Sequence, residues 1–128
     1  MIYTSYYGAL RNLDINQYQL ISISNSIPKG INYEIMKLSL LVPDWDLVNR
    51  YKLGKISEEE YEVNYVQQLN SHKKSILKLI DGISNSNKKD TLLLCWESPD
   101  KFCHRHIFSK WINGLVGEEV IKEFDFRL

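Results

Sequence analysis

Apolar runs and amphipathic stretches alternate along this chain, and their order predicts its fold. Residues 92–95 read Leu-Leu-Leu-Cys without interruption, which is typical of a strand covered on both faces. Residues 18–24 alternate apolar and polar side chains, as a half-buried strand does. Residues 2–4 and 120–126 are further strand candidates near the two ends. We expect strand 91–97 to be the most buried strand and to lie centrally in the sheet.

Helices are predicted between the second strand and the buried one. Pro43-Asp44-Trp45 opens the first helix and Gly54 ends it, because glycine adopts the left-handed conformation that follows many helices. Ser57 and Glu60 have the spacing of a capping box, which starts a helix that runs through Leu69.

A third helix is predicted over residues 73–83, where apolar side chains recur at helical spacing. We expect Gly82 and the polar residues 84–87 to break it. Residues 5–8 are expected to form a loop, and residues 29–42 fit a short helix, a strand or a loop equally well. The order strand, strand, helices, strand, helix, strand predicts a small three-layer α/β domain, Rossmann-like, with a mostly parallel sheet.

Composition and charge narrow the classes of protein. The 128 residues fit a single α/β domain over residues 1–128, and 44% hydrophobic residues supply a core without disulfides or metal. Lysine plus arginine equals aspartate plus glutamate at 16 each, which argues against a basic nucleic-acid-binding face. No apolar run is long enough to span a bilayer, and the first residues do not resemble a signal peptide. We therefore expect a cytoplasmic protein without a membrane partner.

The residues with reactive or ionic side chains gather between the buried strand and a helix predicted near residues 100–113. Ligands of open α/β sheets bind at the carboxyl ends of strands, beside helix N-termini whose backbone N–H groups attract anions. Tyrosines that follow the first strand are expected to lie near the same edge. The candidate ligand-binding residues are Tyr6, Tyr7, Cys95, Trp96, Glu97, Cys103, His104 and Arg105.

Each of these residues also has a purely structural interpretation. Cys103 could be a small core residue, and Arg105 could pair with Glu97 or Asp100. The spacing of cysteines and histidines fits no CxxC or HxxxH pattern, so we expect neither a metal nor a cofactor. A disulfide between the two cysteines is not expected, because one ends a strand, the other starts a helix, and no export signal is present.

The segment 94–106, L-C-W-E-S-P-D-K-F-C-H-R-H, resembles the C-terminal signature of the YeaO-like family, a bacterial and phage domain of unknown function. That signature is a strand ending in Cys, an acidic residue, a Pro-containing loop and then Cys-His-Arg. Many relatives carry a Gly-His-Ser type loop after the first strand and Asp-Val-Arg in the second. This chain has instead Ser5-Tyr6-Tyr7-Gly8 and Ser22-Ile23-Ser24. The resemblance implies the fold and the place of the site, but no settled activity.

Three functions compete at this stage. The first is a small, phage-type protein that binds, and so sequesters, a phosphorylated small molecule such as a nucleotide or nucleotide-derived signal, without turnover. On this hypothesis Arg105 contributes to binding more than to folding, through charge-assisted bonds to an anion. The second is a nucleotide-processing enzyme of hydrolase or glycosidase type that uses Cys103, His104 and Glu97. The third is a protein-interaction module, as in a homodimer, whose Cys-His-Arg segment is structural.

Overall fold

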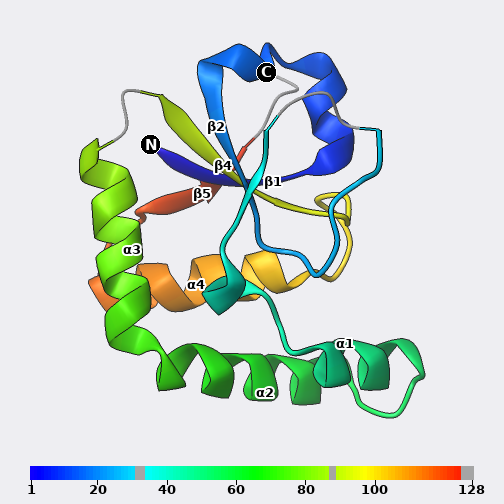
Figure 1. The fold of residues 1–128 in the computed structure, drawn as a ribbon. Coiled ribbons are helices and arrows are strands. Elements are labelled where there is room, and N and C mark those ends of the chain that lie inside the picture. The colour runs from blue at the N-terminus through cyan, green and yellow to red at the C-terminus, as the bar shows by residue number, and fades with distance from the viewer. Residues whose placement is uncertain (31–33, 87–88, 125–128) are drawn as a thin grey trace.

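The computed structural model describes residues 1–30, 34–86 and 89–124. Within these ranges a five-stranded parallel sheet has the order β3-β2-β4-β1-β5 (Figure 1). Its strands are β1 (Ile2–Tyr6), β2 (Tyr18–Ser22), β3 (Met36–Lys37), β4 (Asp90–Cys95) and β5 (Ile121–Glu123). The predicted central position of β4 is confirmed, because β4 pairs with β2 on one side and with β1 on the other.

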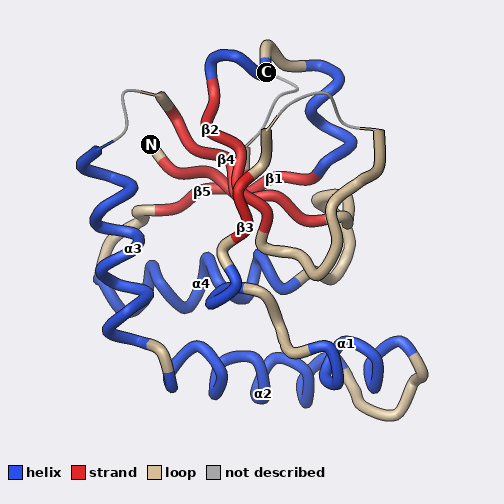
Figure 2. The backbone as a smooth tube through the Cα atoms, viewed as in Figure 1, coloured by secondary structure: helices blue, strands red, loops and turns tan. Residues whose placement is uncertain are grey.

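Two layers of different kinds cover the sheet, as the backbone trace in Figure 2 shows. The α-helices lie on one face, and two short 3₁₀ segments, Tyr7–Asn12 and Ile15–Gln17, lie on the other. The α-helices of the described residues are α1 (Trp45–Lys52), α2 (Glu58–Ser71), α3 (Lys73–Ser86) and α4 (His104–Val116). The predicted three-layer, Rossmann-like α/β fold is confirmed, with 3₁₀ segments in place of α-helices in one layer.

The uninterrupted apolar run of β4 follows from this arrangement. Leu93 and Cys95 pack into the larger core with the α-helices, and Leu92 and Leu94 pack into a smaller core with Tyr7 and other residues of the 3₁₀ face. Successive strand residues point to opposite faces, so both sets must be apolar when both faces are covered. The leucines of β4 are accordingly 0% exposed.

Two local predictions are wrong. Residues 5–8 do not form a loop: β1 continues to Tyr6, because Ser5 and Tyr6 pair with Leu94 and Cys95 of β4, and a 3₁₀ segment starts at the next residue. Helix α3 does not break at Gly82 but runs on to Ser86. A glycine inside a helix costs only about 1 kcal/mol relative to alanine, and packing of the helix's apolar stripe against the core outweighs that cost.

Other predictions hold or become more specific. Ser57 and Glu60 form the predicted capping box, and Gly54 takes a left-handed φ of 72° after α1. The ambiguous stretch 29–42 contributes β3 and the 3₁₀ turn Ser39–Leu41, while residues 31–33 lie outside the described ranges. The last strand is shorter than the predicted 120–126, whose final two residues also lie outside those ranges.

Candidate functional site

A cavity of about 440 Å³ opens beside the carboxyl ends of β2 and β4. Its far wall comes from α1 and from the start of α2, which lie beyond α4 as seen from the sheet (Figure 1). Five aromatic rings and several charged side chains share its lining. The lining residues are Ser24, Asn25, Ser26, Pro43, Trp45, Val48, Tyr51, Lys52, Glu58, Tyr61, Cys95, Trp96, Glu97, Lys101, Phe102, Cys103 and His104.

Cys103 sits at the point where the loop after β4 turns into α4. It has extended backbone angles and is the N-cap of the helix, so His104 and Arg105 are the first two helical residues. The backbone N–H groups of a helix's first turn have no partner inside the helix and carry partial positive charge. Although its side chain is only 5% exposed, Cys103 is part of the cavity wall. The sulfur therefore lies where a helix dipole favours its anionic form.

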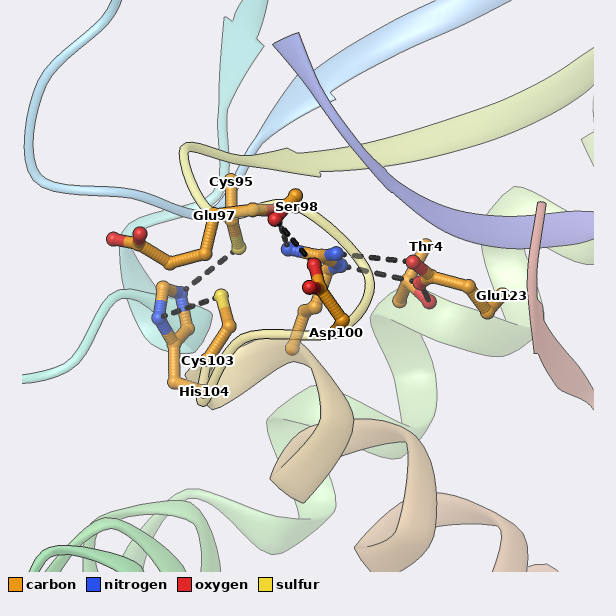
Figure 3. Close-up of polar contacts among 9 residues, drawn as sticks. Thr4, Cys95, Glu97, Ser98, Asp100, Cys103, His104 and Glu123 are labelled. Carbon is orange, nitrogen blue, oxygen red and sulfur yellow. Dashed lines mark hydrogen bonds and ion pairs between the residues drawn. The ribbon is translucent and has the colours of Figure 1, made fainter. Parts of the chain in front are cut away.

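His104 is held in a defined orientation beside both cysteines (Figure 3). Its Nε2 makes a short hydrogen bond with the carbonyl oxygen of Ile23, at the end of β2, and lies 3.4 Å from the Cys95 sulfur. Because a carbonyl can only accept, Nε2 carries a proton, and Nδ1 is the ring nitrogen left to interact with Cys103. Nδ1 faces the Cys103 sulfur at 3.9 Å. The pair is thus arranged for proton exchange between Cys103 and Nδ1.

The two cysteines differ in protonation. A hydrogen bond from the Cys95 thiol is the largest cause that holds the pKa of Cys103 well below its usual range, against the opposing effect of burial; His104 and the backbone amide of Arg105 add to the lowering. Burial raises the pKa of Cys95 well above its usual range. Near neutral pH, Cys103 is therefore the thiolate and Cys95 the thiol that donates to it.

This difference predicts selective alkylation. Iodoacetamide should modify Cys103 and leave Cys95 intact, because only the thiolate reacts. Since the pKa of Cys103 is lowered, its modification should persist as the pH falls below the range where ordinary thiols react. Peptide mass spectrometry over a pH series measures both effects. Equal labelling of the two cysteines, or a rate that falls as for a free thiol, would contradict this assignment.

Arg105 lies outside the cavity lining, although the sequence predicted it as a ligand-binding residue. Its side chain is 0% exposed and forms a two-pronged ion pair with Glu123 of β5, with Nε–Oε1 and Nη2–Oε2 distances of 3.1 and 3.0 Å. Nη1 donates to the carbonyl oxygen of Glu97 at 2.7 Å. The sequence suggested an ion pair of Arg105 with Glu97 or Asp100, but the carboxylate that pairs with Arg105 is that of Glu123. Arg105 ties the loop after β4, the start of α4 and β5 together.

The other predicted residues divide between the cavity and its surroundings. Cys95, Trp96, Glu97, Cys103 and His104 line the cavity together. Tyr6 and Tyr7 are not among the lining residues. The Tyr7 hydroxyl contacts the hydroxyls of Ser22 and Ser24 at 2.7 Å each, and its ring packs on Trp96.

Sequence reasoning missed half of the cavity. Trp45, Tyr51 and Lys52 of α1 line it, as does Ser24-Asn25-Ser26 after β2. The rule that ligands bind at strand carboxyl ends could have found the segment after β2, because β2 is the direct neighbour of β4. No spacing in the sequence signals that α1 packs over this edge.

Cys95, Cys103 and His104 also offer metal-ligand types, with ligand atoms that lie within 4.8 Å of one another. The absence of a CxxC pattern is therefore no argument against a metal here, because the fold brings these residues together. However, the two sulfurs approach different ring nitrogens of His104. One ion on one nitrogen would require a sulfur to move, whereas a thiol, a thiolate and an imidazole fit as they stand.

Comparison with known families assigns the chain to a family. The family described as the active DUF488-N3 subclade matches residues 2–114, a range that includes all the lining residues. The chain belongs to the DUF488 family. Neither the curated proteins nor the solved structures contain a significant match to this DUF488 protein. Among its described residues, every helix is too short or too polar to cross a membrane.

Proposed function

We propose that this DUF488 protein is an enzyme whose Cys103 thiolate attacks a small, nucleotide-like substrate bound in the aromatic cavity. The observation that carries the proposal is the position of the Cys103 sulfur. It lies at the N-terminus of a 13-residue helix, in the cavity wall, between a thiol donor and Nδ1 of an oriented histidine. A lowered pKa, an adjacent base and a group that orients the base are the requirements for a cysteine nucleophile.

Each neighbour of Cys103 has a chemical role in this proposal. The Ile23 carbonyl keeps the proton of His104 on Nε2, so Nδ1 takes the Cys103 proton and later gives it to the leaving group. The first backbone N–H groups of α4 stabilise negative charge that develops on the substrate. Glu97, which lines the cavity and is exposed, is placed to act on an attacking water.

The cavity lining supports a planar, phosphorylated substrate. Trp45 and Trp96 are 60% and 47% exposed although they are large and apolar, and exposed aromatic rings in a pocket are suited to stacking on a nucleobase. Trp96 is held by hydrogen bonds from its Nε1 to Ser26. Lys52 and Lys101 supply positive charge for a phosphate, the role first assigned to Arg105. This favours a nucleotide over a purely apolar ligand.

A second candidate is binding of the same class of ligand without turnover. The buried hydrogen-bond network of Tyr7, Ser22 and Ser24 favours binding without turnover, because its neutral hydroxyls supply no charged acid or base for a reaction. Many YeaO-like relatives carry charged residues in the second strand at the corresponding place. The chain nevertheless has the Cys-Glu-Pro-Cys-His-Arg pattern of those relatives, so we propose that it is a YeaO-like member of its family. The proposed setting is the reducing cytoplasm, where both thiols stay free.

One experiment separates the two candidates. Small molecules released by heat from the purified protein are identified by mass spectrometry, and fresh protein is then incubated with the identified compound. A chemically changed compound, or a covalent adduct on Cys103 in peptide maps, supports the enzyme. Release of the unchanged compound with no adduct would overturn the enzyme in favour of the binder.

The aromatic wall gives a separate prediction for ligand binding. Trp96→Ala should weaken the binding of nucleoside monophosphates at least ~10-fold, because stacking on one aromatic ring is worth about 1–3 kcal/mol per base. Trp111→Phe is the matched control, since Trp111 lies on α4 outside the cavity lining. Titration calorimetry with a panel of four nucleotides measures both. Equal affinities for Trp96→Ala and the parent protein would remove Trp96 from the site.

A further inference from the structure

The two sulfurs at the site are neighbours. The sequence suggested instead that they lie in separate environments, one at the end of a strand and one at the start of a helix. Both cysteines are free in this structure, yet their sulfurs lie within 4.8 Å of each other, and both face the ring of His104 (Figure 3). Cys95 is the last residue of β4 and Cys103 the N-cap of α4. A strand and the helix that follows it meet at these two ends, which explains why a loop of seven residues brings the sulfurs together.

We propose that Cys95 is a resolving cysteine, which forms a reversible disulfide with Cys103 after a peroxide oxidises Cys103. The inference rests on the proposed function only in taking Cys103 as the reactive sulfur. The disulfide would block the nucleophile while protecting it from irreversible oxidation, so the site would be switched off by oxidants and restored by thiols.

The chemistry balances with hydrogen peroxide as the oxidant. The Cys103 thiolate attacks one peroxide oxygen, the O–O bond breaks, and hydroxide leaves and takes up a proton to become water, which leaves a sulfenic acid on Cys103. The Cys95 sulfur then attacks the Cys103 sulfur. The S–O bond breaks, and the hydroxyl group departs as water with the Cys95 proton. One peroxide is reduced to two waters, and two thiol groups become one disulfide.

The structure supports each step of this sequence. Cys103 lines the cavity, so a small peroxide can reach it, and Cys95 lines the same cavity with its sulfur within 4.8 Å of the Cys103 sulfur. The S–S bond of a disulfide is about 2 Å long, so the sulfurs must approach by less than about 3 Å. Cys103 is at the end of a loop and not inside a helix, so rotation of its side chain with a small loop shift achieves this approach.

The test compares the 128-residue protein with single variants at the two cysteines. Each protein is reduced, freed of reductant and exposed to stoichiometric hydrogen peroxide, with a chelator present throughout. Intact mass spectrometry of the parent protein should show a loss of two hydrogens, and peptide maps should show Cys95 joined to Cys103. Dithiothreitol should reverse both changes. In Cys95→Ser the sulfenic acid has no partner, so it should be trapped by dimedone and otherwise gain further oxygens. In Cys103→Ser the remaining thiol should stay unmodified.

Two outcomes would overturn the inference: a parent protein that gains oxygens as readily as Cys95→Ser, or a disulfide that joins two chains instead of two residues of one chain. Cys95→Ala is a second variant without the resolving thiol, so it should give the same dimedone adduct as Cys95→Ser. Agreement between the two variants shows that the adduct does not result from a fold defect of the serine variant. Failure here is distinguishable from failure of the proposed enzyme. Turnover without a disulfide removes only the resolving role of Cys95, and a disulfide without turnover removes only the catalytic role of Cys103.

Discussion

Replacing Arg105 with alanine should lower the free energy of unfolding by about 3–5 kcal/mol, the usual cost of removing one partner from a buried ion pair. The substitution leaves the Glu123 carboxylate, which is only 28% exposed in the folded protein, with Thr4 as its remaining side-chain partner. It also leaves the Glu97 carbonyl without its 2.7 Å donor. Urea denaturation followed by circular dichroism measures the loss.

The chain contains a matched control for this prediction. Arg50 pairs with Asp46 at the same 3.0 Å, but this pair is exposed on α1, with the side chains 39% and 81% accessible. An exposed pair four residues apart on a helix contributes only about 0.3–0.5 kcal/mol, so Arg50→Ala should be nearly neutral.

The reciprocal variant separates the ion pair from the volume of the arginine side chain. Glu123→Ala removes a side chain that does not line the cavity and leaves the buried guanidinium without its carboxylate. It should cost nearly as much as Arg105→Ala, and the double variant less than the sum of the two. Additive losses would show that the pair is not a unit, and losses under about 1 kcal/mol would show that Arg105 is not essential to the fold.

The place of the site could be predicted from the sequence because its signal is local. The run that ends at Cys95 marks a buried strand, and Cys103-His104-Arg105 marks the start of the next helix. Strand carboxyl ends and helix N-termini meet at one edge of a parallel sheet, so this segment alone points to the edge that carries the cavity. The same rule could have placed the two sulfurs close together, since each is at one of those two ends.

The partners of these residues could not be predicted, because they depend on contacts between distant segments. Glu123 reaches Arg105 only because β5 pairs with β1, which sets Thr4 opposite Glu123. Ile23 orients His104 only because β2 lies next to β4. A sequence pattern shows that a side chain is reactive or charged, but the strand order decides whether it faces a ligand or another side chain. Arg105 faces the carboxylate of Glu123, because β5 lies next to β1 in the sheet.

Cys103→Ser should abolish turnover while leaving the fold and the ligand affinity nearly unchanged. The change replaces a sulfur with an oxygen and keeps the backbone donors at the start of α4. However, a serine hydroxyl stays protonated where the Cys103 thiol ionises, so the variant has no anionic nucleophile. Loss of a nucleophile costs on the order of 10³-fold or more in kcat, with little change in substrate binding. Single-turnover kinetics and calorimetry, with the compound released from the native protein, measure the two effects separately.

Cys95→Ser is the matched control, because it makes the same chemical change on the neighbouring sulfur. A serine hydroxyl at this position can still donate to Cys103, so the variant should keep measurable turnover. Because a C–O bond is shorter than a C–S bond, the donor lies farther from the Cys103 sulfur and stabilises the thiolate less, so the apparent pKa in the pH–rate profile should be higher. The direction is decisive: a higher pKa moves the acidic limb of the profile toward neutral pH. If Cys103→Ser kept its turnover, or if both serine variants lost it equally, the cysteine pair would act as one structural or metal-binding unit and Cys103 would not be the nucleophile.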